Sequence, residues 1–178
     1  MTNPKRIIVA ITGASGALYA QRLLQSLTAA DVAIFLVIST LGRRLLHDEL
    51  GMETIDLAAL TGLDNGGGRI TLFPYKDVGA SIASGSFKTD GMVVVPCSSN
   101  KLAEIANGLG DNLISRAAQV VLKENRRLIL VHREMPLSLI DIKNMLAAAQ
   151  AGAILCPANP GFYTLPQTID DIVNFVVA

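Results

Sequence analysis

Glycine and hydroxyl residues directly after apolar runs are the first feature of this sequence that could do chemistry. The run Arg6–Thr12 ends in Gly13–Gly16, and the run Gly91–Val95 leads into Cys97–Asn100. Where such a break opens a helix, backbone N–H groups and hydroxyls can bind an anion, helped by the helix dipole. Small residues also simply permit a tight turn, and the sequence alone leaves both interpretations open.

The charged pair Arg133-Glu134 directly follows a further apolar run, Leu128–Val131. Arg can bind a phosphate through two hydrogen bonds, and Glu can accept a proton. A solvated salt bridge in a loop is the commoner arrangement for such a pair and stays open. Three other charged residues fall within predicted helices, where exposure is the usual outcome: Glu49, Arg116 and Lys123.

The remaining reactive residues carry weaker signals. His47 and His132 have no carboxylate, Cys or Ser at a diagnostic spacing, so the sequence predicts no catalytic role for either. Cys97 and Cys156 lack the CxxC spacing of zinc or redox sites, and we expect no metal. Short-chain dehydrogenases have an entry loop similar to Thr12–Gly16, but their Tyr-x-x-x-Lys pair is missing. The loops fit a mononucleotide such as FMN better than a dinucleotide.

Alternating strands and helices must position these loops. Continuous apolar runs are typical of strands covered on both faces, and they occur at Arg6–Thr12, Val32–Ile38, Gly91–Val95, Leu128–Val131 and Ala153–Leu155, with a weaker one at Arg69–Phe73. Apolar residues recur at helical spacing from Ala17 to Leu27, Leu41–Leu50 is a second helix, and a capping box at Thr168–Asp171 opens a last one. The pattern predicts an α/β fold: a Rossmann-like, flavodoxin-like parallel sheet with helices on both faces.

In such a sheet, ligands bind beyond the carboxyl ends of the strands. We therefore expect the loops after the strands to meet at one edge: Gly13–Gly16, Ser39, Cys97–Asn100, Arg133-Glu134 and Pro157–Tyr163.

Composition narrows the class of protein. Of 178 residues, 51% are hydrophobic and 17% charged, which excludes a disordered chain. The 15 Lys and Arg balance the 15 Asp and Glu, so the basic excess of a nucleic-acid binder is absent. No apolar run is long enough to span a membrane. We expect a soluble, cytoplasmic protein of one domain, with part of its surface buried in a homo-oligomer.

The chain resembles the flavin prenyltransferases of the UbiX type, and the similarity runs nearly end to end. It rests on an ordered series of motifs: Thr12–Gly16, Ala83–Phe87, Pro96–Ser98, Asp111–Ala118, Leu122–Glu124, Arg133–Leu139, Asn144–Leu146 and Pro160–Tyr163. The resemblance implies a Rossmann-like flavoprotein that binds reduced FMN between subunits of a large homo-oligomer, typically a dodecamer. Family members use no metal. They transfer a dimethylallyl group from its monophosphate to N5 and then C6 of FMN, and a UbiD-type decarboxylase uses the prenylated FMN in ubiquinone biosynthesis or aromatic-acid decarboxylation.

Matching the motifs residue by residue implies three groups of site residues. Residues implied to bind FMN are Gly13, Ala14, Ser15, Ser39, Ser98, Ser99, Asn100, Lys101 and Arg116. Residues implied to bind the prenyl phosphate are Lys123, Arg133 and Tyr163. Glu134 and Ser15 are implied to relay the proton lost as the C6 bond forms, and Glu49 matches a carboxylate that family members supply across a subunit contact.

The sequence departs from the family pattern in two places. Lys101 stands where the family usually has Thr, which makes the Ser98–Lys101 turn closer to that of the phosphopantothenoylcysteine decarboxylases. Those flavoproteins use a catalytic His upstream of the turn, and Ala83–Asp90 contains none. An FMN-dependent cysteine-amide decarboxylase and a non-catalytic FMN carrier remain the alternatives. The family pattern also continues past Ala178, so we expect the domain of residues 1–178 to lack a C-terminal helix.

Overall fold

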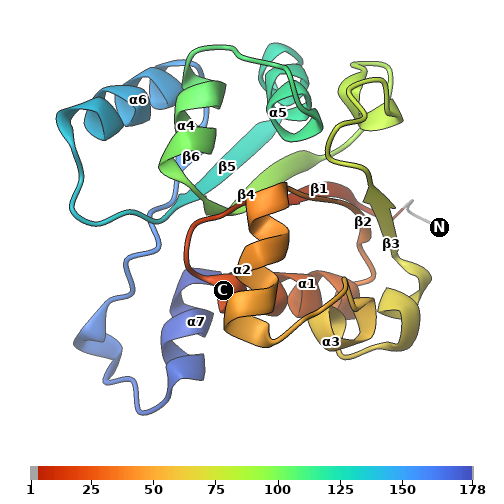
Figure 1. Cartoon of the computed structure of the whole chain (residues 1–178), viewed down its shortest axis with the longest axis vertical. Coiled ribbons are helices and arrows are strands. Elements are labelled where there is room, and N and C mark those ends of the chain that lie inside the picture. The colour runs from red at the N-terminus through yellow and green to blue at the C-terminus, as the bar shows by residue number, and fades with distance from the viewer. Residues whose placement is uncertain (1–3, 178) are drawn as a thin grey trace.

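A computed structural model describes residues 4–177 as a parallel sheet of six strands in the order β3-β2-β1-β4-β5-β6 (Figure 1). The strands are β1 (Arg6–Ile11), β2 (Ala33–Ile38), β3 (Ile70–Phe73), β4 (Gly91–Cys97), β5 (Arg127–His132) and β6 (Ile154–Leu155). Every strand pairs in parallel with its neighbour. The predicted α/β, flavodoxin-like sheet is confirmed.

Helices cover both faces of the sheet (Figure 1). One face carries α1 (Ala17–Ala29), α2 (Thr40–Leu50) and α3 (Leu57–Thr61), with α7 (Ile169–Val177) packed on α1. The other carries α4 (Ser99–Ala106), α5 (Leu113–Lys123) and α6 (Leu139–Gln150), with α6 packed on α4. Short 3₁₀ turns complete the chain: η1 (Asp64–Gly68), η2 (Ser81–Ala83) and η3 (Phe162–Thr164). None of the helices in residues 4–177 combines the length and apolar character needed to cross a membrane.

The central strand β1 shows why its residues are apolar throughout. Ile8 and Ala10 belong to the core under α4 and α5, whereas Val9 and Ile11 belong to the core under α1 and α2. All four are buried. Because both faces of the strand are covered, each large aliphatic side chain contributes on the order of 1.5–3 kcal/mol through burial.

The last helix begins as the sequence predicts. The backbone N–H of Thr168 donates to Asp171 Oδ2 at 2.9 Å, and the N–H of Asp171 donates to Thr168 Oγ1 at 3.2 Å. These reciprocal bonds form the capping box and fix the start of α7 at Ile169.

The strand order reverses between β1 and β4, which is the topological switch point where open α/β sheets bind ligands. Helix α2 comes very close to this edge, because a Cβ atom on Gly42 would lie 2.5 Å from the carbonyl oxygen of Ile11 at the end of β1. The absent side chain of Gly42 therefore lets the N-terminus of α2 approach the end of β1 directly.

We predict that Gly42→Ala lowers the free energy of unfolding by about 2 kcal/mol or more, because the new methyl group overlaps backbone that cannot move freely. Gly79→Ala is the matched control, since its Cβ would meet only Asp77 Oδ1 at 3.5 Å, an ordinary contact. Urea unfolding of both variants measures the difference. Equal stability of the two would contradict the close approach of α2.

Candidate functional site

A single buried hydroxyl joins the ends of β1 and β4. Thr12 Oγ1 donates to the carbonyl oxygen of Pro96 at 2.6 Å and accepts from the N–H of Ser98 at 2.9 Å. Thr12 itself is buried. These bonds hold the loops after the two strands against each other at the switch point.

A cavity of about 170 Å³ lies beside this junction, and we call it the strand-end cavity. Its lining residues are Thr12, Gly13, Ser39, Thr40, Leu41, Tyr75, Ser98, Asn100, Lys101 and Glu104. It therefore brings together five residues for which the family resemblance implies FMN binding: Gly13, Ser39, Ser98, Asn100 and Lys101.

Two helices begin at the strand-end cavity. Ser39 caps α2 by accepting from the N–H of Gly42 at 2.9 Å, and Ser98 caps α4 by accepting from the N–H of Lys101 at 3.3 Å. Other first-turn N–H groups have no acceptor within their own helix, and both helix dipoles place partial positive charge at the cavity. The arrangement suits an anion such as a phosphate. A volume of about 170 Å³ is smaller than the roughly 300–1,000 Å³ of sites for whole ligands, so the cavity has room for no more than one end of a ligand of nucleotide size.

A second cavity of about 260 Å³ lies between α1 and α7, and we call it the α1–α7 cavity. Three of its lining residues are predicted site residues: Ser15, Glu49 and Arg133. Side chains of α7 contribute an apolar wall formed by Ile169, Ile172 and Val173. The lining of this cavity thus combines polar groups that can bind an anion or transfer a proton with apolar side chains that can contact a hydrocarbon group.

Glu49 occupies the N-terminus of α1. Its carboxylate accepts from the N–H of Gly16 at 3.0 Å and from the N–H of Ala17 at 2.8 Å. Gly16 has a φ of 130°, which suits glycine, and α1 has no cap from its own N-cap side chain. The N–H of Gly16 is therefore occupied by a carboxylate of the same chain, and binding of a ligand anion by the turn Gly13–Gly16 stays a prediction.

Tyr19 also lines the α1–α7 cavity, and no pattern in the sequence predicts this position for it. Burial raises the pKa of its phenol, while the positive charge of Arg133 acts in the opposite direction. The hydroxyl is therefore a hydrogen-bond donor at neutral pH.

Glu134 lies in a polar cluster with Ser99 and His132. Ser99 Oγ donates to Glu134 Oε2 at 3.1 Å and lies 3.1 Å from Nε2 of the buried His132. Burial lowers the pKa of His132, with nearby Asp141 and Glu134 opposing the shift, so the imidazole is neutral at pH 7. His132 thus has a hydroxyl and a carboxylate in its neighbourhood that its spacing along the chain does not reveal. Strands β4 and β5 pair so that Cys97 lies next to His132, and this pairing brings His132 close to Ser99. The spacing of these residues along the chain does not reveal the contact.

Six predicted site residues line neither cavity: Ala14, Ser99, Arg116, Lys123, Glu134 and Tyr163. Lys123 is 56% exposed and forms an ion pair with Glu124 at 3.1 Å. On α5, the guanidinium of Arg116 lies 3.5 Å from Gln119 Oε1. Tyr163 is 82% exposed, and its ring meets that of Phe175 edge to face at 5.8 Å between centroids. Ala14, in contrast, is buried within the loop that precedes α1.

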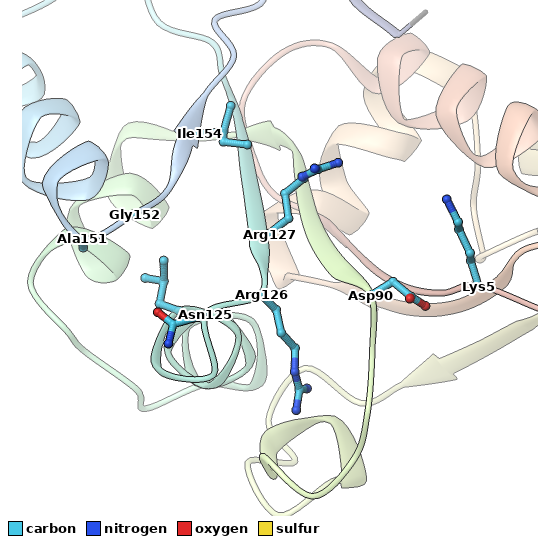
Figure 2. A pocket seen from close by; sticks show the side chains of 9 residues that line it. Lys5, Asp90, Asn125, Arg126, Arg127, Ala151, Gly152 and Ile154 are labelled. Atoms are coloured by element: carbon cyan, nitrogen blue, oxygen red, sulfur yellow. The ribbon is translucent and has the colours of Figure 1, made fainter.

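A larger hollow, about 690 Å³, lies at the opposite edge of the sheet, where the strands begin (Figure 2). Lys5 precedes β1, Asp90 precedes β4 and Arg127 begins β5. Arg126 points to a different side from Arg127 in Figure 2, and it donates to the carbonyl oxygens of Gly85 and Phe87 at 2.7 and 2.9 Å. None of the predicted site residues lines this hollow.

We predict that Glu49→Ala lowers the free energy of unfolding by about 0.5–1 kcal/mol, because two N–H groups of α1 lose a charged acceptor at an exposed site. The control is Glu53→Ala, since that side chain is 87% exposed and its only ion pair within residues 4–177 is a 3.6 Å contact with His47. Thermal unfolding at low and high salt measures both. A loss no larger than that of the control would contradict the capping role.

Comparison with known proteins places the chain in a family. The flavoprotein family model matches residues 1–178. The flavin prenyltransferase UbiX of Deinococcus radiodurans is 42% identical over 99% of this chain and 87% of its own length. The flavin prenyltransferase UbiX of Thermoplasma acidophilum is 47% identical over 97% of this chain and 91% of its own length.

Solved structures agree with these relatives. The crystal structure of AnUbiX (PadA1) in complex with FMN and dimethylallyl pyrophosphate has a TM-score of 0.90 and 40% identity, covering 98% of this chain and 89% of that one. A dodecameric FMN-dependent UbiX-like decarboxylase from Escherichia coli O157:H7 has a TM-score of 0.88 and 45% identity, covering 97% and 91%. A mutant PPC decarboxylase reaches only 19% identity at a TM-score of 0.69, which shows the shared fold alone. The chain therefore belongs to the flavoprotein family and, within it, to the flavin prenyltransferases of the UbiX type.

Proposed function

We propose that this chain transfers a dimethylallyl group from dimethylallyl monophosphate to N5 and C6 of reduced FMN. The observation that carries the proposal is the strand-end cavity, where the capped N-termini of α2 and α4 meet at the switch point. Its size and positive partial charge fit the phosphate end of FMN, which leaves the flavin ring outside the cavity. When bound, FMN supplies the nucleophilic ring atoms of the reaction.

Arg133 is the residue of this chain best placed to receive the departing phosphate. It lines the α1–α7 cavity together with Ser15 and the apolar side chains of α7. A guanidinium can take up the charge that develops on a leaving phosphate, which is the task that a metal ion performs in many other phosphate-dependent enzymes. In our proposal the α7 wall holds the hydrocarbon part of the prenyl substrate.

In our proposal the protein is a homo-oligomer, and neighbouring subunits supply Lys123 and Tyr163 to the site of the prenyl phosphate. A neighbouring subunit likewise supplies Arg116 to the FMN site. This part of the proposal is supported by their absence from both cavities and by large exposed apolar side chains on and near α6. Those side chains are Met135, Leu139, Ile140, Ile142 and Leu146. An apolar surface of this kind favours burial against another subunit, and a dodecamer is the assembly we propose.

Glu134 accepts the proton that leaves C6. Its Oε2 accepts a hydrogen bond from Ser99, and its Oε1 accepts from the N–H of Met135 at 3.1 Å, so both oxygens have a defined orientation. Ser15 joins this relay from the α1–α7 cavity.

We further propose that the prenylated FMN passes in the cytoplasm to a UbiD-type decarboxylase, in ubiquinone biosynthesis or the decarboxylation of aromatic acids.

The direct test is a mass spectrum of the flavin extracted after anaerobic incubation of the protein with reduced FMN and dimethylallyl monophosphate. We expect the flavin to gain one prenyl unit. A flavin that is bound but unmodified would contradict the transferase and identify an FMN carrier. Release of carbon dioxide from a cysteine amide would instead identify a decarboxylase.

We predict that Glu134→Gln slows ring closure at C6 by about 100-fold or more, since an amide cannot accept the proton. Glu53→Gln, at an exposed position, is the charge-matched control and keeps the wild-type rate. Chromatography of the extracted flavins separates the closed product from the singly attached isomer. Wild-type closure in the Glu134 variant would rule out its role as the proton acceptor.

A further inference from the structure

Lys101 is a buried cation beside the strand-end cavity. Its side chain is 4% exposed, and Nζ donates to Asn112 Oδ1 at 3.0 Å and to Ser115 Oγ at 3.1 Å. It also forms an ion pair with Glu104 and lies 3.4 Å from the hydroxyl of Tyr75. With these partners, Nζ has no donor left for a ligand, so Lys101 does not bind a phosphate directly.

Glu104 brings a negative charge to the same cavity. Its side chain is 27% exposed, and Oε2 also accepts from Ser115 Oγ at 2.5 Å and from Asn112 Nδ2 at 2.9 Å. Burial acts to raise the pKa of this carboxyl, but hydrogen bonds from Lys101, Ser115 and Asn112 lower it overall. Glu104 is therefore ionised at neutral pH.

The negative charge of Glu104 disfavours the binding of a phosphate in the strand-end cavity unless a positive charge neutralises it. The cavity measures only about 170 Å³, so a phosphate inside it would lie within a few ångströms of the Glu104 carboxylate. Like charges so close in a partly buried site repel strongly. The ion pair with Lys101 is the feature that cancels the repulsion, and the described residues provide no other ion pair to Glu104.

We propose that Lys101 is a specificity-determining residue, which neutralises Glu104 so that the strand-end cavity accepts the phosphate of FMN. The inference rests on the proposed binding of FMN, because it names the phosphate end of that molecule as the group in the cavity. Lys101 acts through Glu104 and is a positioning and charge-compensating group rather than a catalytic residue.

A purely structural role would give a different result. Lys101 also connects α4 to Tyr75 and to Asn112, the N-cap of α5, so its removal could loosen the whole wall of the cavity. Loosening would weaken the binding of any flavin. Uncompensated charge on Glu104 would weaken only the binding of a flavin that carries phosphate, and riboflavin, which lacks the phosphate, separates the two effects.

The test measures dissociation constants of oxidised FMN and riboflavin, by fluorescence quenching, for the wild-type protein, Lys101→Met, Glu104→Gln and the double variant. We expect Lys101→Met to weaken FMN binding by about tenfold or more with riboflavin changed less than about twofold. Glu104→Gln should favour FMN over riboflavin more than the wild type does, because the ammonium is then unopposed. The double variant should return the ratio of the two affinities to near the wild-type value.

The inference would be overturned if Lys101→Met weakened the binding of FMN and of riboflavin equally. It would also be overturned if the double variant bound FMN as weakly as Lys101→Met does. Should Lys101→Met fail to fold, Glu104→Gln decides alone, and an unchanged ratio of affinities contradicts the proposal. A wild-type protein that binds riboflavin but not FMN would overturn the proposed function as well. If the wild-type protein prefers FMN and every variant has the same ratio of FMN to riboflavin affinity, the role of Lys101 is overturned while the proposed function is unaffected.

Discussion

The hydroxyl of Thr12 is the contact on which the site depends. By donating to Pro96 and accepting from the N–H of Ser98, it ties the end of β1 to the end of β4, the two strands between which the sheet order reverses. The N-terminus of α4 is thereby held beside the loop after β1, and the missing side chain of Gly42 brings the N-terminus of α2 to the same place. A buried hydroxyl and a close backbone contact thus aim two helix dipoles at one small cavity.

The partial positive charge at a helix N-terminus is satisfied in two different ways at this edge of the sheet. At α1 the positive end of the helix meets the carboxylate of Glu49, so the charge is satisfied within the chain. At α2 and α4 the capping groups are the neutral hydroxyls of Ser39 and Ser98, which leave the positive end available to an external anion. Under the proposed function, the charge of the cap rather than the glycine content of the loop decides which helix N-terminus is open to a ligand.

Much of this arrangement follows from the sequence. Continuous apolar runs predict the strands, because a parallel strand is covered on both faces, and the switch-point rule predicts that Ser39 and Ser98 share an edge. Three features do not follow from it. Glu49 reaches α1 from another helix, His132 meets Ser99 only through the pairing of β4 with β5, and Lys101 is directed into a network that includes Asn112 and Tyr75. Each depends on tertiary packing between segments whose spacing along the chain carries no periodic signal.

The central claim is that the phosphate end of FMN lies in the strand-end cavity, between the N-termini of α2 and α4. A crystal structure of the protein with FMN tests this most directly. The account predicts phosphate oxygens within hydrogen-bond distance of the first-turn N–H groups of α2 and of the Ser98 turn, with Glu49 still bound to Gly16 and Ala17. A phosphate that displaces Glu49 from α1, or that lies among Lys5 and Arg127 at the opposite edge of the sheet, would contradict it.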